Sequence, residues 1–536
     1  MGIPSYFSHI IRNYSNIIRG LQFFDENKQV IHHLLMDCNS IVYDAVRELE
    51  TSFDEETASQ FESNVIDLVI KRIYMYIKLI RPTKSVYIAF DGVAPFAKMD
   101  QQRNRRYKSS LNTRLDNDKS VPRWNTSSIT PGTAFMNKLS DRVTYEFNYA
   151  ETKCTVNKVY VSCSDKPGEG EHKLFDHMRH NIHSDEAVAI YGLDSDLIML
   201  SIFHLEYCEN IYVCREAPEF IKSSITIQTS SDNDLLFMDI KHFSHSILAE
   251  MKCVDHSKQR IYDYVFLCFL LGNDFLPHFP SLNIRTTGIQ VIMDVYRQLI
   301  GSQPGKFIVS EKNQIQWNSV SKLIGELAKR EHELLNAEYA TRNKFEKRTF
   351  PESTQEEQAD YVMSAPIIYR GIEQYICPSQ SKWEDRYYKS LFHNNRTTEF
   401  IKQVCINYLE GLQWVMTYYS AGCMDWRWKY NYHYAPLLVD LYKYVPHFEM
   451  DFISTKAKKS NVPFSSNAQL AYVLPGSMLH IAPKPVSTFL KKIHPEKYPE
   501  SYTLQWAFCR YLWEAHPLIP EISKTMLEQW EVRFDQ

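Results

Sequence analysis

The sequence predicts an α/β protein with a mainly parallel central sheet flanked by helices. Three short apolar runs each end in acid: VIHHLLMD at Asp37, SVYIAFD at Asp91, and AVAIYGLDSD at Asp194 and Asp196. Such runs are typical of parallel strands that are buried on both faces. Between them, apolar residues recur at helical spacing, for example at Val65, Ile66, Val69, Ile73, Ile77 and Ile80. Strands and helices in alternation favour a parallel sheet covered by helices.

The chain of 536 residues is long enough for several domains or one large core, and length alone suggests roughly three to four domains. Residues 1–300 carry the alternating pattern and form the first expected part. Residues 301–380 are more polar, with the stretch KFEKRTFPESTQEEQAD, and we expect helices and a loop that join two parts. Residues 381–536 form the other part, which is rich in aromatic residues, as in LQWVMTYYSAGCMDWRWKYNYHYAP.

Composition excludes several classes of protein. A net charge of -4 argues against a domain that coats nucleic acid, although it leaves room for a local basic cleft. The 11 cysteines form no C-x-x-C pair, so neither a disulfide framework nor a zinc site is indicated, and a reducing compartment is expected. No secretory signal and no apolar run of membrane-spanning length is evident. We therefore expect no membrane association and a cytoplasmic location, with the nucleus as the alternative.

Acidic residues gather where a parallel sheet places its ligand crevice, outside the carboxyl ends of the strands. Asp194 and Asp196 are two apart at a strand end, so both can face one cation. Glu169 and Glu171 are also two apart, in KPGEGEHKLFDHM, and a regular helix would turn them apart by about 200°. Gly168 and Gly170 let the backbone leave helical geometry there, so that both glutamates can face one site.

Asp274 brings the set to seven, because it follows the apolar stretch IYDYVFLCFLLG in the predicted turn GNDFLPH. Any one acid after a strand has a plain alternative as an Asx turn or a helix N-cap. Burying seven together is prohibitive without cations. Oxygen ligands select Mg²⁺ or Mn²⁺, and two such ions suit phosphodiester hydrolysis. The predicted catalytic and metal ligands are Asp37, Asp91, Glu169, Glu171, Asp194, Asp196 and Asp274.

A basic segment, GVAPFAKMDQQRNRRYK, follows Asp91 directly. If residues 98–108 are helical, one broad face carries Lys98, Gln102, Arg105 and Arg106. Arginine forks suit phosphate oxygens, so this face can hold a terminal monophosphate beside the metals. The alternative is a solvated cationic helix. Three aromatic residues, Tyr43, Trp426 and Trp428, are candidates for stacking on a nucleobase, although aromatics at this density more often form core.

The motifs MGIPSYF, DCNSIVYD, FDGVAPFAKMDQQRNRR, PGEGEHK, YGLDSDLIML and LLGNDFLPHFPSL resemble the first conserved region of the Xrn 5′→3′ exoribonucleases. WEDRYYKSLF, YLEGLQWVMTYY, WRWKYNYHYAP, AYVLPGSM and WAFCRYLWEAHPLIPEI resemble the second conserved region. The middle third is weakly covered.

The resemblance implies a PIN/FEN-like nuclease core and a mostly helical second conserved region packed against it as one catalytic unit. It implies a processive enzyme that takes single-stranded RNA with a 5′-monophosphate and releases mononucleotides, with decapping or RNA-decay factors as partners. The family's acidic ligands fall on the seven acids named above, and its phosphate pocket falls on Lys98, Gln102, Arg105 and Arg106. All eleven are present.

The chain also departs from the family pattern. Tyr43 stands where the family has His, Phe96 replaces a customary Arg, and Ser5 and Ser8 replace basic residues, so we expect a weaker grip on RNA or weaker duplex displacement. The chain is expected to lack the long C-terminal extension of cytoplasmic members and the zinc knuckle of some nuclear ones. The remaining alternatives are a flap-type structure-specific nuclease, against which residues 383 onward argue, and a non-catalytic RNA-binding scaffold, against which the intact acids argue.

Overall fold

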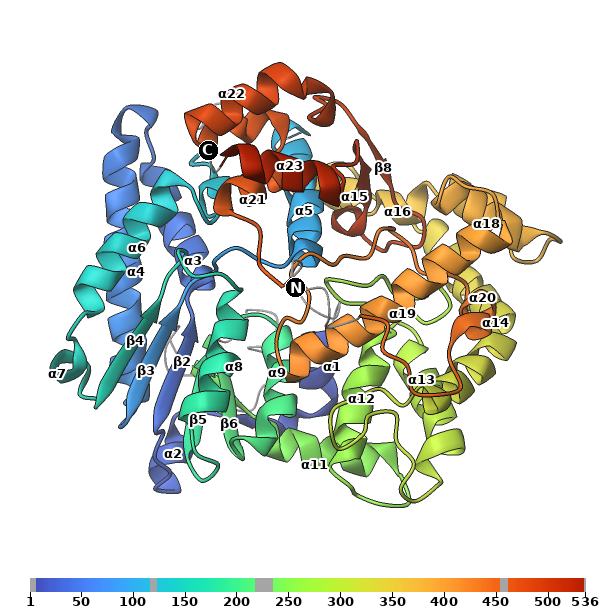
Figure 1. The fold of residues 1–536 in the computed structure, drawn as a ribbon, viewed down its shortest axis with the longest axis horizontal. Helices are drawn as coiled ribbons and strands as arrows, with labels where there is room; N and C mark the ends of the chain where they lie inside the picture. The colour runs from blue at the N-terminus through green and yellow to red at the C-terminus, as the bar shows by residue number, and fades with distance from the viewer. Residues whose placement is uncertain (1–5, 116–122, 217–234, 454–460, 535–536) are drawn as a thin grey trace.

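The computed structural model describes residues 6–115, 123–216, 235–453 and 461–534, and its centre is a seven-stranded sheet (Figure 1). The strands lie in the order β1-β7-β6-β5-β2-β3-β4. Their bounds are β1 (Ile18–Arg19), β2 (His33–Asp37), β3 (Ser85–Ala89), β4 (Lys158–Ser162), β5 (Ala187–Tyr191), β6 (Asn210–Glu216) and β7 (Leu235–Asp239).

Five neighbouring strands run parallel, which confirms the predicted fold class. β2 pairs with β3 in the register His33 to Ser85 and with β5 in the register His33 to Val188. β4 and β6 extend the parallel set on either side, whereas β7 and then β1 pair antiparallel at one edge. The chain order reverses between β2 and β5, and a ligand crevice is expected outside the carboxyl ends of the strands at such a reversal.

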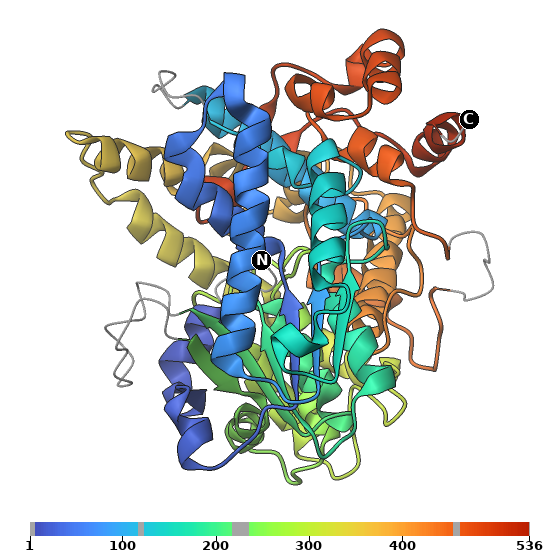
Figure 2. The ribbon, with the colours of Figure 1, turned by 90° about the vertical axis from the view of Figure 1, so that its left-hand side faces the viewer.

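Helices cover both faces of the sheet. One face packs against α3 (Asn39–Leu49), α4 (Ala58–Ile80) and α6 (Ala134–Phe147), and Figure 2 shows α4 and α6 in front of the strands. The six apolar residues predicted to share a helix all lie on α4 and are all buried. The other face packs against α8 (Gly170–Asn181), α9 (Asp196–Phe203), α11 (Ile240–Met251) and α12 (Gln259–Phe269).

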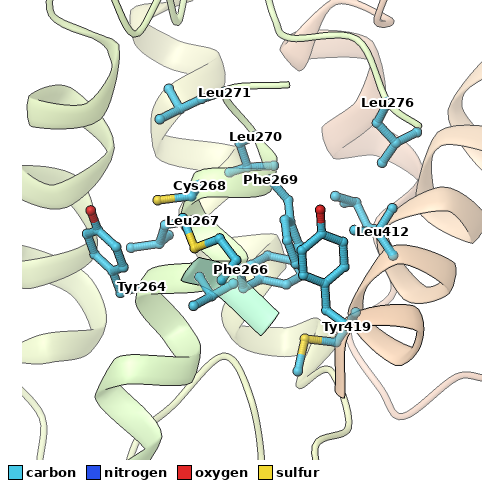
Figure 3. Close-up of a cluster of buried hydrophobic side chains, with 14 of the residues drawn as sticks. Tyr264, Phe266, Leu267, Cys268, Phe269, Leu270, Leu271, Leu276, Leu412 and Tyr419 are labelled. Atoms are coloured by element: carbon cyan, nitrogen blue, oxygen red, sulfur yellow. The ribbon is translucent and has the colours of Figure 1, made fainter. Parts of the chain in front are cut away.

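Residues 383–453 join the core on this second face. α19 (Thr398–Ser420) packs against α12, and Figure 3 shows Phe269 of α12 beside Tyr419 of α19. The ring centroids of these two residues are 5.2 Å apart. Residues 301–380 do contain helices, and the longest, α14 (Trp317–Glu346), buries Trp317 and Leu323 in the same core. This segment is therefore continuous with the packed body of the protein.

A third apolar cluster surrounds the long helix α5 (Phe96–Leu115), which lies in Figure 1 between the sheet and the C-terminal helices. Phe96 and Met99 of α5 pack there against α21 (Ser466–Val473), α22 (Lys484–Ile493) and α23 (Lys524–Phe534). In the described part of the chain, the other α-helices and strands are α1 (Tyr6–Asn13), α2 (Gln22–Glu26), α7 (Glu151–Cys154), α13 (Gly288–Tyr296), α15 (Gln355–Met363), α16 (Ala365–Ile368), α17 (Gly371–Ile376), α18 (Trp383–Leu391), α20 (Leu438–Leu441), β8 (Thr503–Gln505) and β9 (His516–Leu518).

Within the described residues, no helix combines the length and the apolar character needed to cross a bilayer.

Candidate active site

The acids at the strand ends meet at one edge of the sheet. Asp37 is the last residue of β2, Asp91 lies two residues beyond β3, and Asp194 lies three residues beyond β5. Because β5, β2 and β3 are neighbours and parallel, their carboxyl ends adjoin. Asp196 opens α9, the helix that follows β5.

The two glutamates reach this edge through the turn that precedes α8. Gly168 has φ +101°, a conformation that L side chains disfavour, and Glu169 is extended, so α8 begins only at Gly170. The Gly170 amide donates to Asp91 Oδ1 at 2.6 Å, and a β-carbon on Gly170 would lie 2.6 Å from Asp37 Oδ1. A glycine is required at this position because the helix start lies directly against two carboxylates.

Asp274 lies in the turn that follows α12 and not at a strand end. The Asn273 side chain accepts from the amides of Phe275 and Leu276 at 2.9 Å each, which makes a tight turn. The Lys98 ammonium then lies between two acids, 2.9 Å from Asp274 Oδ2 and 2.9 Å from Glu169 Oε2. The ammonium of Lys98 on α5 thus links Asp274 to Glu169.

A cavity of about 520 Å³ opens over these groups. Six of the seven predicted acids line it, while Asp196, 1% exposed, lies behind the wall and shares a hydrogen bond with Tyr419. The lining also includes Lys98, Gln102, Arg105, Arg106 and Tyr43, together with Tyr6, Phe7, Asn39, Ser40, Ile129, Pro131, Leu193 and Ser195. The predicted acidic and basic sets therefore share one cavity.

Burial and mutual repulsion raise the pKa of several of these carboxyls. The pKa of Asp37 is raised to about 8, first by burial and then by the charge of Asp91. The pKa of Asp196 is raised to about 8 by burial and by Asp194 and Asp274. Burial likewise raises the pKa of Glu169 and that of Glu171. The Lys98 ammonium lowers the pKa of Glu169, but burial outweighs it.

The donor chemistry of the cluster fits a hard divalent cation. Among the described residues, no group of three or more acidic, histidine or cysteine side chains is arranged so that it could hold a metal ion, and the Lys98 ammonium bridges two of the acids. The buried Asp196 Oδ1 atom has no hydrogen-bond partner within the described part of the chain. An orphaned buried oxygen and carboxyls with raised pKa values are what an all-oxygen ligand set for Mg²⁺ or Mn²⁺ presents without its cations.

The basic residues of α5 differ in how firmly they are held. Arg106 is buried and donates to Thr130 Oγ1 at 2.5 Å, but its other terminal nitrogen has no described partner, and burial lowers its pKa to about 10. Gln102 is buried beside Gln469 of α21, whereas Arg105 is exposed. An anion in the cavity would therefore contact the guanidinium of Arg106, which is held in place, and that of Arg105, which can change its conformation.

The three predicted stacking residues separate. Tyr43 is half-buried on α3 and lines the cavity. Trp428 does not line it: its ring is 8% exposed, stacks on Trp414 at 5.2 Å, and donates to Glu410. Trp426 also lies outside the lining and packs near Gly168, in the loop that carries Glu169. The structure thus brings only Tyr43 to the cavity.

Sequence reasoning missed three groups that hold the acids. The Asn39 side chain accepts from the Asp91 amide at 3.1 Å and donates to the Asp91 carboxylate. Tyr418 donates to Glu169 Oε1 at 3.1 Å, and Tyr419 bonds Asp196. Asn39 was signalled by its place two residues after Asp37. The tyrosines lie more than 200 residues away in sequence, inside an aromatic run that reads as core.

The positions that depart from the family pattern are partly resolved. Phe96 is 1% exposed, packs edge-on against Phe464 and Tyr472, and lies 5.4 Å from the Lys429 ammonium. Its ring therefore belongs to the third cluster. Ser5 and the side chain of Ser8 lie outside the described residues.

Comparison with known proteins places this chain in a family. Residues 1–217 match the family model described as the XRN 5′-3′ exonuclease N-terminus, and residues 255–382 and 376–535 match the Xrn1 helical domain. The chain belongs to the Xrn family of 5′-3′ exoribonucleases. The Xrn resemblance and the prediction of an exoribonuclease are thereby confirmed.

Several Xrn relatives match almost all of this chain. It is 24% identical to a 5′-3′ exoribonuclease 2 homolog of Drosophila melanogaster over 98% of this chain and 70% of the relative. It is 24% identical to the 5′-3′ exoribonuclease 2 of Candida albicans over 100% of this chain and 72% of that protein. The human 5′-3′ exoribonuclease 1 is 25% identical, and the match covers 99% of this chain but 34% of the human protein.

Proposed function

We propose that this Xrn-family enzyme degrades single-stranded RNA that carries a 5′-monophosphate, processively and in the 5′→3′ direction, to nucleoside 5′-monophosphates. One observation carries the proposal: six of the seven acids and all four basic-pocket residues line the same cavity. A terminal phosphate held by α5 would place the next phosphodiester at the acids, so one end of the RNA sets the point of cleavage.

The basic residues would bind and orient the 5′-phosphate. The Arg106 nitrogen that has no partner among the described residues and the exposed guanidinium of Arg105 offer donors to phosphate oxygens. A terminal monoester carries more negative charge than an internal diester, so this pocket favours an RNA end. Tyr43 would stack on the first base, and stacking tolerates any sequence.

The acids would bind two ions of Mg²⁺ or Mn²⁺. Their ligands would be Asp37, Asp91, Glu169, Glu171, Asp194, Asp196 and Asp274. Such ions supply positive charge for the attacking water, the scissile phosphate and the leaving 3′-oxygen. Burial disfavours the charge on the Lys98 ammonium, but Asp274 and Glu169 outweigh burial and raise its pKa well above the usual range. Lys98 therefore stays charged and orients two acids.

The setting of the enzyme is also a proposal. The 11 cysteines are all free thiols, which suits a reducing compartment, and we place the enzyme in the cytoplasm, where decapping or other RNA-decay factors would supply 5′-monophosphorylated RNA.

The test compares three RNAs of one sequence that carry a 5′-monophosphate, a 5′-hydroxyl or a 5′-triphosphate, each incubated with the protein and Mg²⁺. We expect rapid release of mononucleotides from the monophosphate alone, and no release in EDTA. Equal rates on the 5′-hydroxyl RNA would overturn the phosphate pocket. Release of oligonucleotides from a branched or flapped substrate in preference would indicate a flap-type nuclease instead.

A further inference from the structure

A second cavity, of about 330 Å³, lies on the other side of α5. Its wall combines α5, the turn after α12, the segment 429–434 and the segment 507–516. α5 separates the two cavities because residues three to four apart share one face of a helix, and different faces of α5 line the two cavities. Ala97, Gln101, Asn104 and Lys108 line the second cavity, and Lys98, Gln102 and Arg106 line the first. Arg105 and Asp274 line both, so the two cavities share part of a wall.

The second cavity has aromatic walls. Phe275, Tyr430 and Phe508 line it and are buried. Trp513 also lines it, is 42% exposed, and stacks on Tyr511 at 5.9 Å with an interplanar angle of 14°. Flat rings with one exposed member suit a planar group that enters from solvent.

Polar groups in this wall are left without partners. Both the nitrogen and the oxygen of the Gln101 amide are buried and have no hydrogen bond to any described residue, and the same holds for the Asn273 amide nitrogen. A buried polar group without a partner costs about 1–3 kcal/mol, so these groups call for a ligand or ordered water. A planar amide with donor and acceptor both available matches the edge of a nucleobase.

The charges favour an anion. Each acid of the wall already forms an ion pair: Asp100 with Lys429 at 3.0 Å, Glu514 with Arg285 at 2.7 Å, and Asp274 with Lys98 at 2.9 Å. In contrast, Arg105 and Lys108 form no ion pair with a described carboxylate, and Lys108 donates to the Trp513 carbonyl at 2.6 Å. The cavity therefore keeps a net positive charge beside its aromatic wall.

We propose that this second cavity binds a nucleoside 5′-monophosphate, the product of the proposed reaction, with its phosphate on Lys108 and its base against Gln101 and the aromatic wall. The inference rests on the proposed function for the identity of the ligand. A volume of about 330 Å³ is near the lower end of small-molecule sites, roughly 300–1,000 Å³, and so accommodates one nucleotide rather than a chain. Arg105 would hold the 5′-phosphate in the first cavity, so a neighbouring cavity that shares Arg105 is reached from the 5′ side of the cleaved bond.

The experiment measures binding of AMP by calorimetry to the full chain in EDTA, where no hydrolysis occurs, with the first cavity filled by saturating 5′-monophosphorylated RNA. We expect AMP to bind this complex, and inorganic phosphate and adenosine each to bind far more weakly. Gln101→Leu, which removes only the amide, should weaken AMP binding about tenfold, since the loss of one hydrogen bond to a buried group costs about 1.4 kcal/mol. Gln60→Leu, at an exposed position on α4, is the matched control and should bind AMP as the wild type does.

Trp513→Ala, at the partly exposed rim of the second cavity, tests the same site if Gln101→Leu fails to fold. This variant should also weaken AMP binding. Complete displacement of AMP by the RNA overturns the inference, because AMP then binds only the first cavity. Equal AMP affinity in both variants and the wild type overturns the inference as well. The inference also fails if Gln101→Leu weakens binding of an oligoribonucleotide but not binding of AMP. If hydrolysis proves independent of the 5′-monophosphate while AMP binding still depends on Gln101, the proposed function fails and the nucleotide site remains.

Discussion

The first region (residues 1–300) and the second region (residues 381–536) contribute to the active site in different ways. Among the described residues, the first region supplies every acid and every cation that lines the catalytic cavity. The second region supplies neutral contacts behind the wall: the Tyr418 hydroxyl on Glu169, the Tyr419 hydroxyl on Asp196 and the Gln469 amide on Gln102. The second region therefore contributes positioning contacts, whereas the charged groups come from the first region.

The physical basis of this division is visible at Tyr418. Its ring lies between the rings of His172 and Trp414, with ring centroids 3.6 Å and 4.6 Å away, so the hydroxyl has a fixed position. A buried tyrosine combines an apolar ring that packs in a helical core with one polar atom that reaches a carboxylate. Strand ends bring short acids together, and a packed helix holds them in place.

The largest expected effect tests the charged half of the comparison. Replacing Asp194 and Asp196 together by Ala should abolish mononucleotide release while leaving RNA binding measurable, because the phosphate-binding residues are untouched. Release is followed by chromatography, and RNA binding by fluorescence anisotropy. Substantial turnover in this double variant would show that the strand-end acids are not the reactive centre.

The next effect concerns the basic face of α5. Arg105→Ala should remove most of the preference for a 5′-monophosphate over a 5′-hydroxyl, about tenfold or more, since a charge-assisted hydrogen bond contributes about 1.5–3 kcal/mol. The measurement is the ratio of kcat/KM on the two RNAs. Arg142→Ala, on the distant helix α6, is the control. An unchanged ratio in Arg105→Ala would remove Arg105 from the pocket.

A smaller effect is expected from the positioning half. Tyr418→Phe removes only the hydroxyl on Glu169 and should lower kcat about tenfold with little change in KM for RNA, because a hydrogen bond to a charged group contributes about 1.5–3 kcal/mol. The Mg²⁺ concentration at half-maximal rate should rise, which a loss of packing alone would not cause. Tyr145→Phe, at a 77% exposed ring, should match the wild type. If both variants match the wild type, the second region does not position Glu169.

The smallest effect contrasts the two ends of the sheet. At the amino end of β5, Glu186 receives hydrogen bonds from Lys84, the His183 amide and His33. Burial opposes its charge, but these three partners outweigh burial and lower its pKa to about 2, the reverse of the shift at Asp37.

A lowered pKa means that Glu186 stabilises the fold above its unfolded pKa of about 4.3 and loses that contribution as the pH falls toward 2. Lys84 is half exposed, so we expect only about 1 kcal/mol. Glu186→Gln should therefore be less stable than the wild type at pH 7, and the difference should shrink at pH 3. Urea unfolding at both pH values measures it, and a difference that grows as the pH falls would contradict the assigned shift.

Much of this architecture follows from local pattern. The runs ending at Asp37, Asp91 and Asp194 predict adjacent parallel strands because each side chain in a buried strand must be apolar until the chain leaves the sheet. Gly168 and Gly170 predict the broken helix start at Glu169. Residues 98–108 predict the helix that carries the basic face. Each prediction depends only on neighbouring residues, and the structure has these elements where they were expected.

The partners of these elements could not be predicted in the same way. Trp428 is part of the core, while Tyr418, from the same aromatic run, reaches Glu169, and nothing in the spacing of the run distinguishes them. Residues 301–380 read as a polar connection, yet α14 buries Trp317 because it packs on distant helices. Burial of a helix depends on what covers it, and that is a long-range property.

The sequence by itself determined the strands, the order of the acids and the basic face of α5, since these depend on residue type and period. Only the tertiary structure decided that Lys98 would bridge Glu169 and Asp274, that Tyr43 alone of three aromatics would face the cavity, and that α5 would separate two cavities. The reason is that contacts between residues far apart in the chain depend on how helices and sheet pack, and packing is fixed by the whole core at once.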